Sequence, residues 1–203
     1  MSPAANYDED LKLVELCRSG DRIAFDRLVM KYQHIVVGMC TRLTGSRADG
    51  EDTAQECFVK VFRHIARFSG ESTFSTWLYR IVVNTCRNRH RSWWNRLSRQ
   101  TSTLDETSDS NDTTGDKSTT LRDTRFTPVK DLERKRLGLA IETAINQLPP
   151  KYKVVVVLRD LQELTYEEIE TISGMNEGTV KSRLFRARSI LQQKLKGLKN
   201  ERS

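Results

Sequence analysis

The sequence has little of what marks membrane, metal-binding and disulfide-rich proteins. Its 203 residues include four scattered cysteines without a CxxC pair, and three histidines that do not cluster. We therefore expect reduced core thiols rather than disulfides or a zinc site, and no metal or other cofactor. No run approaches the roughly 20 apolar residues of a membrane span, and the N-terminus MSPAANYDEDLK is acidic where a secretion signal is basic. We expect a cytoplasmic protein without membrane insertion.

Catalytic signatures are also missing. The chain has no glycine-rich phosphate-binding loop, no paired carboxylates in a metal-binding setting and no Cys/His zinc set of the kind that nucleic-acid enzymes use. We therefore predict that the protein is not an enzyme and has no catalytic residues.

Charge is present, but it is unevenly distributed around a net charge of +7. Residues 80–99 hold six arginines and no acid, and residues 177–202 hold eight basic residues against two acids. Residues 105–123 are the reverse, with six acids and two bases in a run rich in Ser, Thr and Asp. Such a run cannot bury enough surface to offset its ordering entropy. We interpret residues 98–130 as a flexible, disordered acidic linker between two domains, at 1–97 and 131–203.

Apolar spacing predicts an all-α fold, because apolar residues recur three and four positions apart and no strand pattern is sustained. In the N-terminal domain, Asp8 and Asp21 can cap two helices, the second of which stops at Gly45. A third helix is expected from residues 46–49 onward and a fourth from about Thr73. The third is expected to bury Ala54, Phe58, Val61, Phe62 and Ile65.

The C-terminal domain is expected to begin with a helix over residues 128–147. Its core-spaced residues are Leu132, Leu139, Ile141 and Ile145. Pro149 ends this helix, and Pro150 suits the first turn of the next one. That next segment, KYKVVVVLRDL, has the β-branched composition of a strand. We predict a helix, because the proline start outweighs a small propensity and no partner strand lies nearby.

The segment ELTYEEIETISGMNEGTVKSRLFRARSIL predicts a helix-turn-helix. Thr165 and Glu168 form a capping box, Gly174 permits a tight turn and Asn176 can cap a second helix. That second helix places Val180, Leu184, Ala187 and Leu191 toward the core. In a helix-turn-helix, the N-terminal residues of the second helix meet base edges in the major groove. The alternative is a solvated basic amphipathic helix.

The outer face of this second helix carries donors suited to duplex DNA. It holds Gly178, Lys181, Ser182, Phe185 and Arg186. Lys181 or Arg186 can donate to guanine O6 and N7, and an exposed Phe185 can meet a thymine methyl. Ser182 can bond to several bases. We assign phosphate contacts to Arg159, Arg183 and Arg188.

The stretch FSGESTFSTWLYRIVVNTCRNRHR, residues 68–91, combines aromatic rings with four arginines and one acid. One face of its helix carries Trp77, Arg80, Asn84, Arg87 and Arg91, and Phe68 precedes it. Aromatic rings beside cations suit unstacked bases, because each base that stacks on a ring contributes about 1–3 kcal/mol of binding free energy. We predict single-strand contact here. For Trp77 alone, burial in the core is an equally good interpretation.

Base capture is too weak to open a duplex unaided. Opening about ten base pairs costs on the order of 14 kcal/mol, at ~1.4 kcal/mol per step, far more than one or two captured bases return. A larger partner must therefore supply the rest. The segment ADGEDTAQECF offers it an acidic face of Asp49, Asp52, Gln55 and Glu56. Favourable charge at a helix start and a pair between Glu56 and Lys60 explain this face equally well.

Four motifs in order resemble one family. ADGEDTAQECFVKVF, FSGESTFSTWLYRIVVN, LPPKYKVVVVLRDL and LTYEEIETISGMNEGTVKSRLFRAR are similar to the extracytoplasmic-function sigma factors of bacterial RNA polymerase. The resemblance implies an N-terminal domain that docks on the beta-prime coiled coil of core polymerase and recognises the minus-ten promoter element. It implies a C-terminal helix-turn-helix that reads the minus-thirty-five element as duplex, and an anti-sigma factor as a further partner.

The same resemblance implies roles for individual residues. It makes the acidic face a polymerase contact, assigns capture of a flipped base to Phe68, Trp77, Arg80 and Asn84, and assigns duplex reading to Lys181, Ser182, Phe185 and Arg186. The chain departs from the family where Asn176 and Glu177 replace a common proline before the recognition helix. Glu177 can accept from a cytosine amino group or repel phosphate, so the promoter sequence cannot be transferred.

Two other functional classes are alternatives for this sequence, a transcriptional regulator and a nucleic-acid enzyme. An autonomous helix-turn-helix transcriptional regulator would need only the C-terminal half, but such proteins usually dimerise on a palindrome, and this chain has no heptad seam. A nucleic-acid enzyme would need the catalytic groups that are missing above. The acidic linker fits either imitation of nucleic acid or a passive tether.

Overall fold

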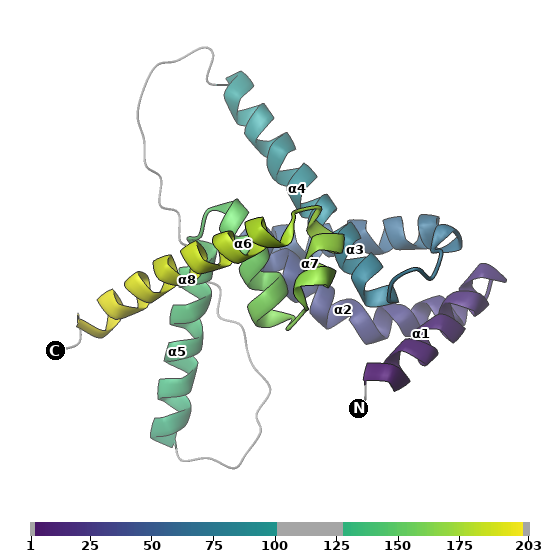
Figure 1. Ribbon diagram of the computed structural model, residues 1–203, viewed down its shortest axis with the longest axis horizontal. Coiled ribbons are helices and arrows are strands. Elements are labelled where there is room, and N and C mark those ends of the chain that lie inside the picture. Colours follow the sequence, from purple (N-terminus) through teal and green to yellow (C-terminus); the bar gives the residue numbers. More distant parts are fainter. Residues whose placement is uncertain (1–2, 101–127, 201–203) are drawn as a thin grey trace.

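The computed structural model describes the backbone of residues 3–100 and 128–200, and the side chains of residues 8–89 and 136–196. Within these ranges the chain is helical and has no strand, which is the predicted all-α class (Figure 1). The N-terminal elements are α1 (Pro3–Arg18), α2 (Arg22–Thr44), α3 (Arg47–His64), the 3-10 turn η1 (Ile65–Arg67) and α4 (Phe74–Gln100). The C-terminal elements are α5 (Pro128–Asn146), α6 (Pro150–Val156), the π-helical turn η3 (Val157–Leu161), α7 (Tyr166–Ser173) and α8 (Glu177–Asn200).

Most of the predicted helix ends are confirmed. The Asp21 carboxylate accepts from two backbone amides at the start of α2, and Ser46 accepts from the Asp49 amide at the start of α3. The Thr73 hydroxyl accepts from the Thr76 amide where α4 begins. The predicted cap at Asp8 is wrong, because α1 begins at Pro3 and Asp8 lies inside the helix. Short polar side chains therefore fix three of the four N-terminal helix starts.

Helix α1 is fastened to the rest of its domain by polar contacts. Asp10, only 4% exposed, accepts from Lys31 Nζ at 2.7 Å and from the Tyr32 hydroxyl at 2.5 Å. The Arg18 guanidinium donates to the Phe68 carbonyl. A buried carboxylate needs such partners, since an unpaired one would carry a large desolvation penalty. The middle of α1 is thereby tied to α2, and its C-terminal end to the loop before α4.

A glycine sets the close crossing of α2 and α3. A Cβ atom built on Gly50 would lie 2.4–2.6 Å from three atoms of Thr41, two of them backbone. No side chain fits at that distance, so the two helices meet through bare backbone. The Cys40, Cys57 and Cys86 thiols, scattered in the sequence, are buried together at the junction of α2, α3 and α4. Their hydrogen bonding and burial raise the pKa of the Cys40 thiol.

The valine-rich segment is helical, as predicted. Pro150 occupies the first turn of α6, and Val155, Val156 and Val157 are buried as α6 continues into η3. Burial on every side favours valine here more strongly than its modest helix propensity opposes it. The predicted core of α5 is only partly right. Ile145 is buried, but Leu139 is 65% exposed and Ile141 is 37% exposed, while Leu132 lies outside the residues with described side chains.

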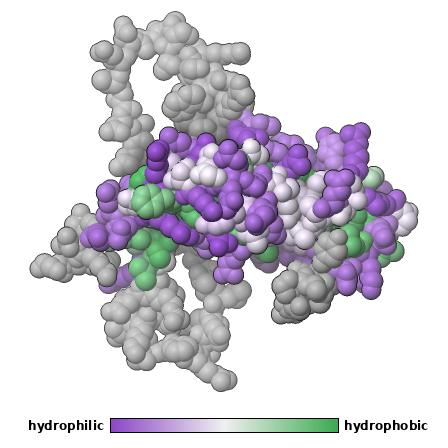
Figure 2. Space-filling view, viewed as in Figure 1, coloured by the Kyte–Doolittle hydropathy of each residue, from purple (hydrophilic) through white to green (hydrophobic). Residues whose placement is uncertain are grey.

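The two helical groups pack against each other. Figure 1 shows α7 beside α4 and the C-terminal helices α5 and α6 near α2, and these neighbours are in contact. Helix α4 extends through residues 98–100 and α5 begins at Pro128, so both ends of the predicted linker are helical; residues 101–127 lie outside the described ones. Figure 2 shows a mostly hydrophilic face with hydrophobic surface over the neighbourhood of α5 and α8.

Candidate nucleic-acid interfaces

The first candidate interface lies at the start of α4 and rests on a cluster of aromatic rings. Phe68, Phe74 and Trp77 contact one another with centroids 5.5–6.0 Å apart, and Tyr32 of α2 adds a fourth ring 5.5 Å from Phe74. Phe68 and Phe74 are each 2% exposed, whereas Trp77 is half-buried. The rings form a packed cluster, which we call the ring platform, in which Trp77 is partly exposed.

The expectation that the Phe68 ring is exposed is wrong. Its ring is 2% exposed and packs against Phe74 and Trp77. The buried ring therefore offers no open face on which a base could stack, and the predicted DNA contact of Phe68 stays a prediction.

The polar members of the same face are available. Arg80 and Arg87 are exposed, and Asn84 is half-buried between them. Arg87 Nη2 donates to Asn84 Oδ1 at 2.5 Å, which fixes the amide with its oxygen toward the arginine and its NH₂ group free to donate. Arg91 lies outside the residues with described side chains. The face thus offers one amide, two cations and one half-buried ring within about three helical turns.

The predicted acidic face on α3 is exposed. Asp49, Asp52, Gln55 and Glu56 all point to solvent. Sequence reasoning missed that Arg89 of α4 reaches this face, with Nη2 3.2 Å from Asp49 Oδ1 and 3.5 Å from Asp52 Oδ2. The expected pair between Glu56 and Lys60 is present at 2.7 Å. The acidic face of α3 is therefore linked to α4 by the ion pairs of Arg89.

The second candidate interface is the predicted helix-turn-helix, and its local geometry is confirmed. Thr165 and Glu168 form the complete capping box at the start of α7, and Gly174 ends that helix with a left-handed φ of 70°. Asn176 Oδ1 accepts from the Thr179 amide at 2.9 Å where α8 begins. Val180, Leu184 and Ala187 are buried, with Leu191 half-buried.

The outer face of α8 is open to solvent. Gly178, Lys181, Ser182, Phe185 and Arg186 are all exposed, and Phe185 is 78% exposed. Arg186 donates to the Tyr152 hydroxyl of α6, which lowers the pKa of Tyr152. Tyr152 was not among the predicted site residues, since no sequence pattern joins positions so far apart.

Glu177, the acid at the start of α8, has a partner. Its carboxylate lies 2.5 Å from Lys181 Nζ, and this hydrogen bond raises the pKa of the lysine. Lys181 Nζ also lies 5.3 Å from the centroid of the Tyr166 ring on α7. Glu177 therefore forms an ion pair with Lys181, a residue that was predicted to contact base edges.

The three predicted phosphate contacts have different surroundings. Arg188 is exposed and pairs with Asp160, Nη2 lying 2.5 Å from Oδ1. Arg159 is half-buried, donates to the Leu164 carbonyl at 2.6 Å and stacks over Tyr166. Arg183 is half-buried and points toward Met175 at the turn. Arg159 and Arg183 therefore hold the helix-turn-helix together, and Arg188 is the most available of the three.

No described group of three His, Cys, Asp or Glu side chains is placed to hold a metal ion. None of the helices in the described ranges has the length and apolar run that a membrane crossing requires.

Comparison with known families covers both interfaces. The family described as Sigma-70 region 2 matches residues 28–96, and that described as Sigma-70, region 4 matches residues 138–191. The ECF RNA polymerase sigma-E factor of Haemophilus influenzae is 40% identical over 189 residues, covering 93% of this chain and 96% of that protein. The RNA polymerase sigma-H factor of Pseudomonas aeruginosa is 36% identical over 194 residues, covering 96% and 97%.

Solved structures share the architecture. The sigma factor RpoE in complex with the anti-sigma factor NepR from Bartonella quintana aligns with a TM-score of 0.62 at 20% identity, covering 85% of this chain and 96% of that one. At this identity the likeness concerns the fold alone. Because the matches extend over the N-terminal half as well, a regulator built from the helix-turn-helix alone does not account for the chain.

Proposed function

This chain belongs to the extracytoplasmic-function (ECF) sigma factors of bacterial RNA polymerase, and from that premise we propose how its residues divide promoter recognition. It is an alternative sigma factor, which binds core RNA polymerase, directs promoter-specific transcription initiation and is not an enzyme. The assignment of residues to DNA and to polymerase is our proposal. The proposed working place is the cytoplasm, where the polymerase and the promoter are.

The α4 face is proposed to capture an unpaired base of the minus-ten element. Trp77 supplies a ring edge that the buried Phe68 and Phe74 hold in place, and the free NH₂ group of Asn84 can donate to the base. Arg80 and Arg87 are exposed and suit the backbone of the same strand. A preformed ring platform suits this task because the captured base loses its neighbours in the stack and regains one contact here.

The α8 face is proposed to read the minus-thirty-five element as duplex. Arg186, Lys181 and Ser182 are exposed on the first turns of a helix that follows a glycine turn, the position that enters the major groove. Arg188 is assigned to phosphate. The observation that carries the division is the difference in exposure: the ring at the duplex-reading face is 78% exposed, whereas Phe68 and Phe74 at the base-capturing face are buried.

The acidic α3 face is proposed as a contact with the beta-prime coiled coil. Asp49, Asp52, Gln55 and Glu56 are exposed on one face, and charge of this kind steers association with a basic partner. Because Arg89 bridges this face to α4, polymerase docking and base capture occur on helices tied to each other. An anti-sigma factor is proposed as a further partner. The domain assignment follows the predicted division at 1–97 and 131–203, with the acidic linker between them.

Run-off transcription with core polymerase on a random promoter library tests the function. We expect transcripts that start downstream of two recurring elements with a fixed spacing, and none without the protein. Tight protection of a duplex site by the protein alone, with no promoter opened when core polymerase is added, would contradict it. Replacing Asp49 and Asp52 together by Asn should lower the yield at limiting polymerase, whereas replacing the exposed Asp26 by Asn should not.

A further inference from the structure

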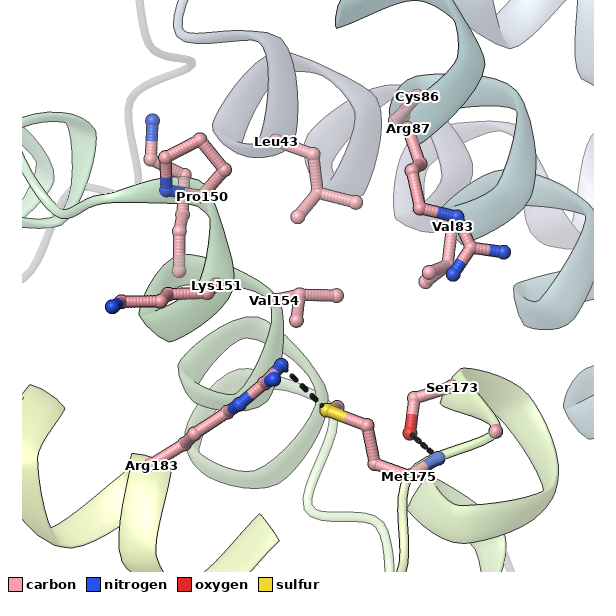
Figure 3. A pocket seen from close by; sticks show the side chains of 12 residues that line it. Leu43, Val83, Cys86, Arg87, Pro150, Lys151, Val154, Ser173, Met175 and Arg183 are labelled. Carbon is pink, nitrogen blue, oxygen red and sulfur yellow. Dashed lines mark hydrogen bonds between the residues drawn. The ribbon is translucent and has the colours of Figure 1, made fainter. Parts of the chain in front are cut away.

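A cavity of about 460 Å³ lies between the two domains. Its walls come from the end of α2, from α4, from α6 and from the turn between α7 and α8. Figure 3 shows Leu43 and Val154 facing the same space, with Arg87 on the α4 side and Arg183 on the α8 side. The volume falls in the range of about 300–1,000 Å³ that small-molecule sites occupy. The cavity shares Arg87 with the α4 face and Arg183 with the helix-turn-helix, and its other lining residues belong to neither proposed DNA face.

One wall holds a buried lysine without an anionic partner. Lys153 is 6% exposed, and its Nζ makes no hydrogen bond or ion pair with the described residues. Because no fully buried side-chain nitrogen in the described part of the chain lacks a partner, this Nζ still reaches the open space of the cavity. Its Nζ lies 3.8 Å from where a Cβ of Gly45 would be, next to the C-terminal end of α2. The negative end of that helix dipole compensates only part of a full charge. Burial accordingly lowers the pKa of Lys153, with no neighbouring charge acting against it.

The rest of the cavity is positive as well. Arg87, Lys151 and Arg183 line it together with Lys153, and none of the described residues that line it is a carboxylate. Lys151 is exposed and lies over the Tyr152 ring, and Arg183 contacts only the sulfur of Met175. Arg87 and Lys151 are exposed, so water screens their charge, whereas Lys153 and Arg183 are at least half-buried and make the cavity wall positive. The cavity therefore fits a ligand with a negative group.

The remaining wall is aliphatic. It is formed by Leu43, Val83, Pro150, Val154 and Met175, and within the described part of the chain no lining residue is aromatic. A nucleotide base would find no ring on which to stack, whereas a flexible hydrocarbon body can fill an irregular aliphatic cavity. The lining thus favours a small ligand that joins an anionic group to an aliphatic body.

We propose that this cavity binds a small amphipathic anion, an aliphatic carboxylate in its simplest form, with the anionic group at Lys153 and the aliphatic body against Val83 and Val154. Because α4 and the α7–α8 turn contribute opposite walls, one bound molecule contacts both domains. Occupancy then stabilises the packing of the helix-turn-helix on α4. The binding itself depends on neither polymerase nor DNA, so it can be tested separately from the proposed promoter roles.

Calorimetric titration of the full-length protein with octanoate tests the proposal, with octanol and inorganic phosphate as comparison ligands. We expect saturable binding of one octanoate per chain, at least about tenfold tighter than either comparison ligand, since each of them lacks one half of the recognition. If octanol bound as tightly as octanoate, the cations would not contribute to recognition. Equal binding of phosphate would remove the role of the aliphatic wall, and absence of octanoate binding would overturn the proposal.

Variants test the position of each half of the ligand. Lys153→Met keeps the length of the side chain and removes the charge, so we expect it to fold at least as stably as the parent and to bind octanoate roughly tenfold or more weakly. Val154→Phe places a ring in the cavity and should weaken octanoate binding through the other wall. Lys12→Met, an exposed lysine of α1, is the matched control and should bind as the parent does. Unchanged binding by Lys153→Met would overturn the assignment.

Changes in amide chemical shifts locate the bound octanoate. With octanoate we expect shifts on both sides of the cavity, at Val83 and Cys86 of α4 and at Ser173, Gly174 and Met175 of the turn. Shifts confined to one domain, or spread over the exposed apolar residues of α5, would show binding elsewhere and would contradict the proposal.

Discussion

The two faces of this sigma factor that we propose to contact DNA are built in opposite ways. At the proposed base-capturing face, Phe68 and Phe74 are 2% exposed and belong to the core, and Trp77 is half-buried. At the proposed duplex-reading face, Phe185 on α8 is 78% exposed. The first face is the edge of the hydrophobic core, and the second is the solvent side of an amphipathic helix.

The difference follows from the two substrates. Duplex DNA is stiff and presents an ordered row of base edges, so exposed side chains on one helix suffice to read it. A single strand has lost its stacking, and a protein surface must supply the order. A ring platform fixed by core packing does so without losing side-chain entropy on binding. Substitutions at the two faces should accordingly differ in their effect on stability.

The largest difference is expected between two phenylalanines. Phe74→Ala removes a fully buried ring with three ring neighbours, and should lower the free energy of unfolding by about 3–5 kcal/mol. Phe185→Ala should change it by less than about 0.5 kcal/mol, because its ring is already in water. Urea denaturation followed by circular dichroism measures both. Similar values for the two variants would remove the structural contrast between the faces.

Alkaline pH should act on the N-terminal core. Burial raises the pKa of Tyr79 from 10 to about 12 and also raises that of Tyr32. The folded state keeps these protons to a higher pH than the unfolded state does, so stability is complete below about pH 10 and falls as pH rises through about 12. For Tyr79 the loss is on the order of 2–3 kcal/mol, at ~1.4 kcal/mol per pH unit. In Tyr79→Phe the decline between pH 10 and 12 should be shallower; an unchanged slope would show that Tyr79 does not titrate with unfolding.

Two arginines of α8 should separate sequence reading from general affinity. Arg186→Ala should cost about 1–3 kcal/mol on the selected minus-thirty-five duplex and relax the preference at one position. Arg188 is already paired with Asp160, so Arg188→Ala should weaken binding to all sequences by a smaller amount and reduce the salt dependence. Fluorescence anisotropy of the holoenzyme on labelled duplexes, at several salt concentrations, gives both quantities. A sequence-specific loss in Arg188→Ala would reverse these roles.

The smallest effect is expected at Glu177. Glu177→Gln removes the partner of Lys181 and one negative charge close to DNA, and should strengthen duplex binding by a few tenths of a kcal/mol without regard to sequence. The same anisotropy assay detects it. A loss of affinity confined to sites with one particular base pair would instead show that Glu177 accepts a hydrogen bond from cytosine.

Local features of the fold could be predicted because they depend on near neighbours in the chain. The caps at Asp21, Thr165 and Asn176 each involve residues two or three positions apart, and the proline before the valine run decided its helical state. The helix-turn-helix was predicted in full for the same reason. Patterns of this kind are visible wherever one helix turn contains the whole interaction.

Burial was predicted less well where a helix is apolar on more than one side. Phe62 was expected to be buried but is 56% exposed, with its ring in contact with Phe25, and Leu139 is 65% exposed. Phe68 was expected to contact DNA, yet its ring is 2% exposed and packs against Phe74 and Trp77. Spacing shows which residues share a face, but the neighbouring elements decide whether that face is covered. The pair of Arg89 with Asp49 and the cavity around Lys153 are invisible in sequence for the same reason.

The central claim is that duplex and single-stranded DNA are bound by separate faces, on α8 and α4. Its most direct test is the affinity of holoenzymes carrying Asn84→Ala or Arg186→Ala for two fragments of a selected promoter: the minus-thirty-five duplex alone and the non-template minus-ten strand alone. We predict reciprocal losses, with Asn84→Ala weakened only on the single strand and Arg186→Ala weakened only on the duplex. If either substitution lowers binding to both fragments equally while the protein stays folded, the two faces do not divide the work.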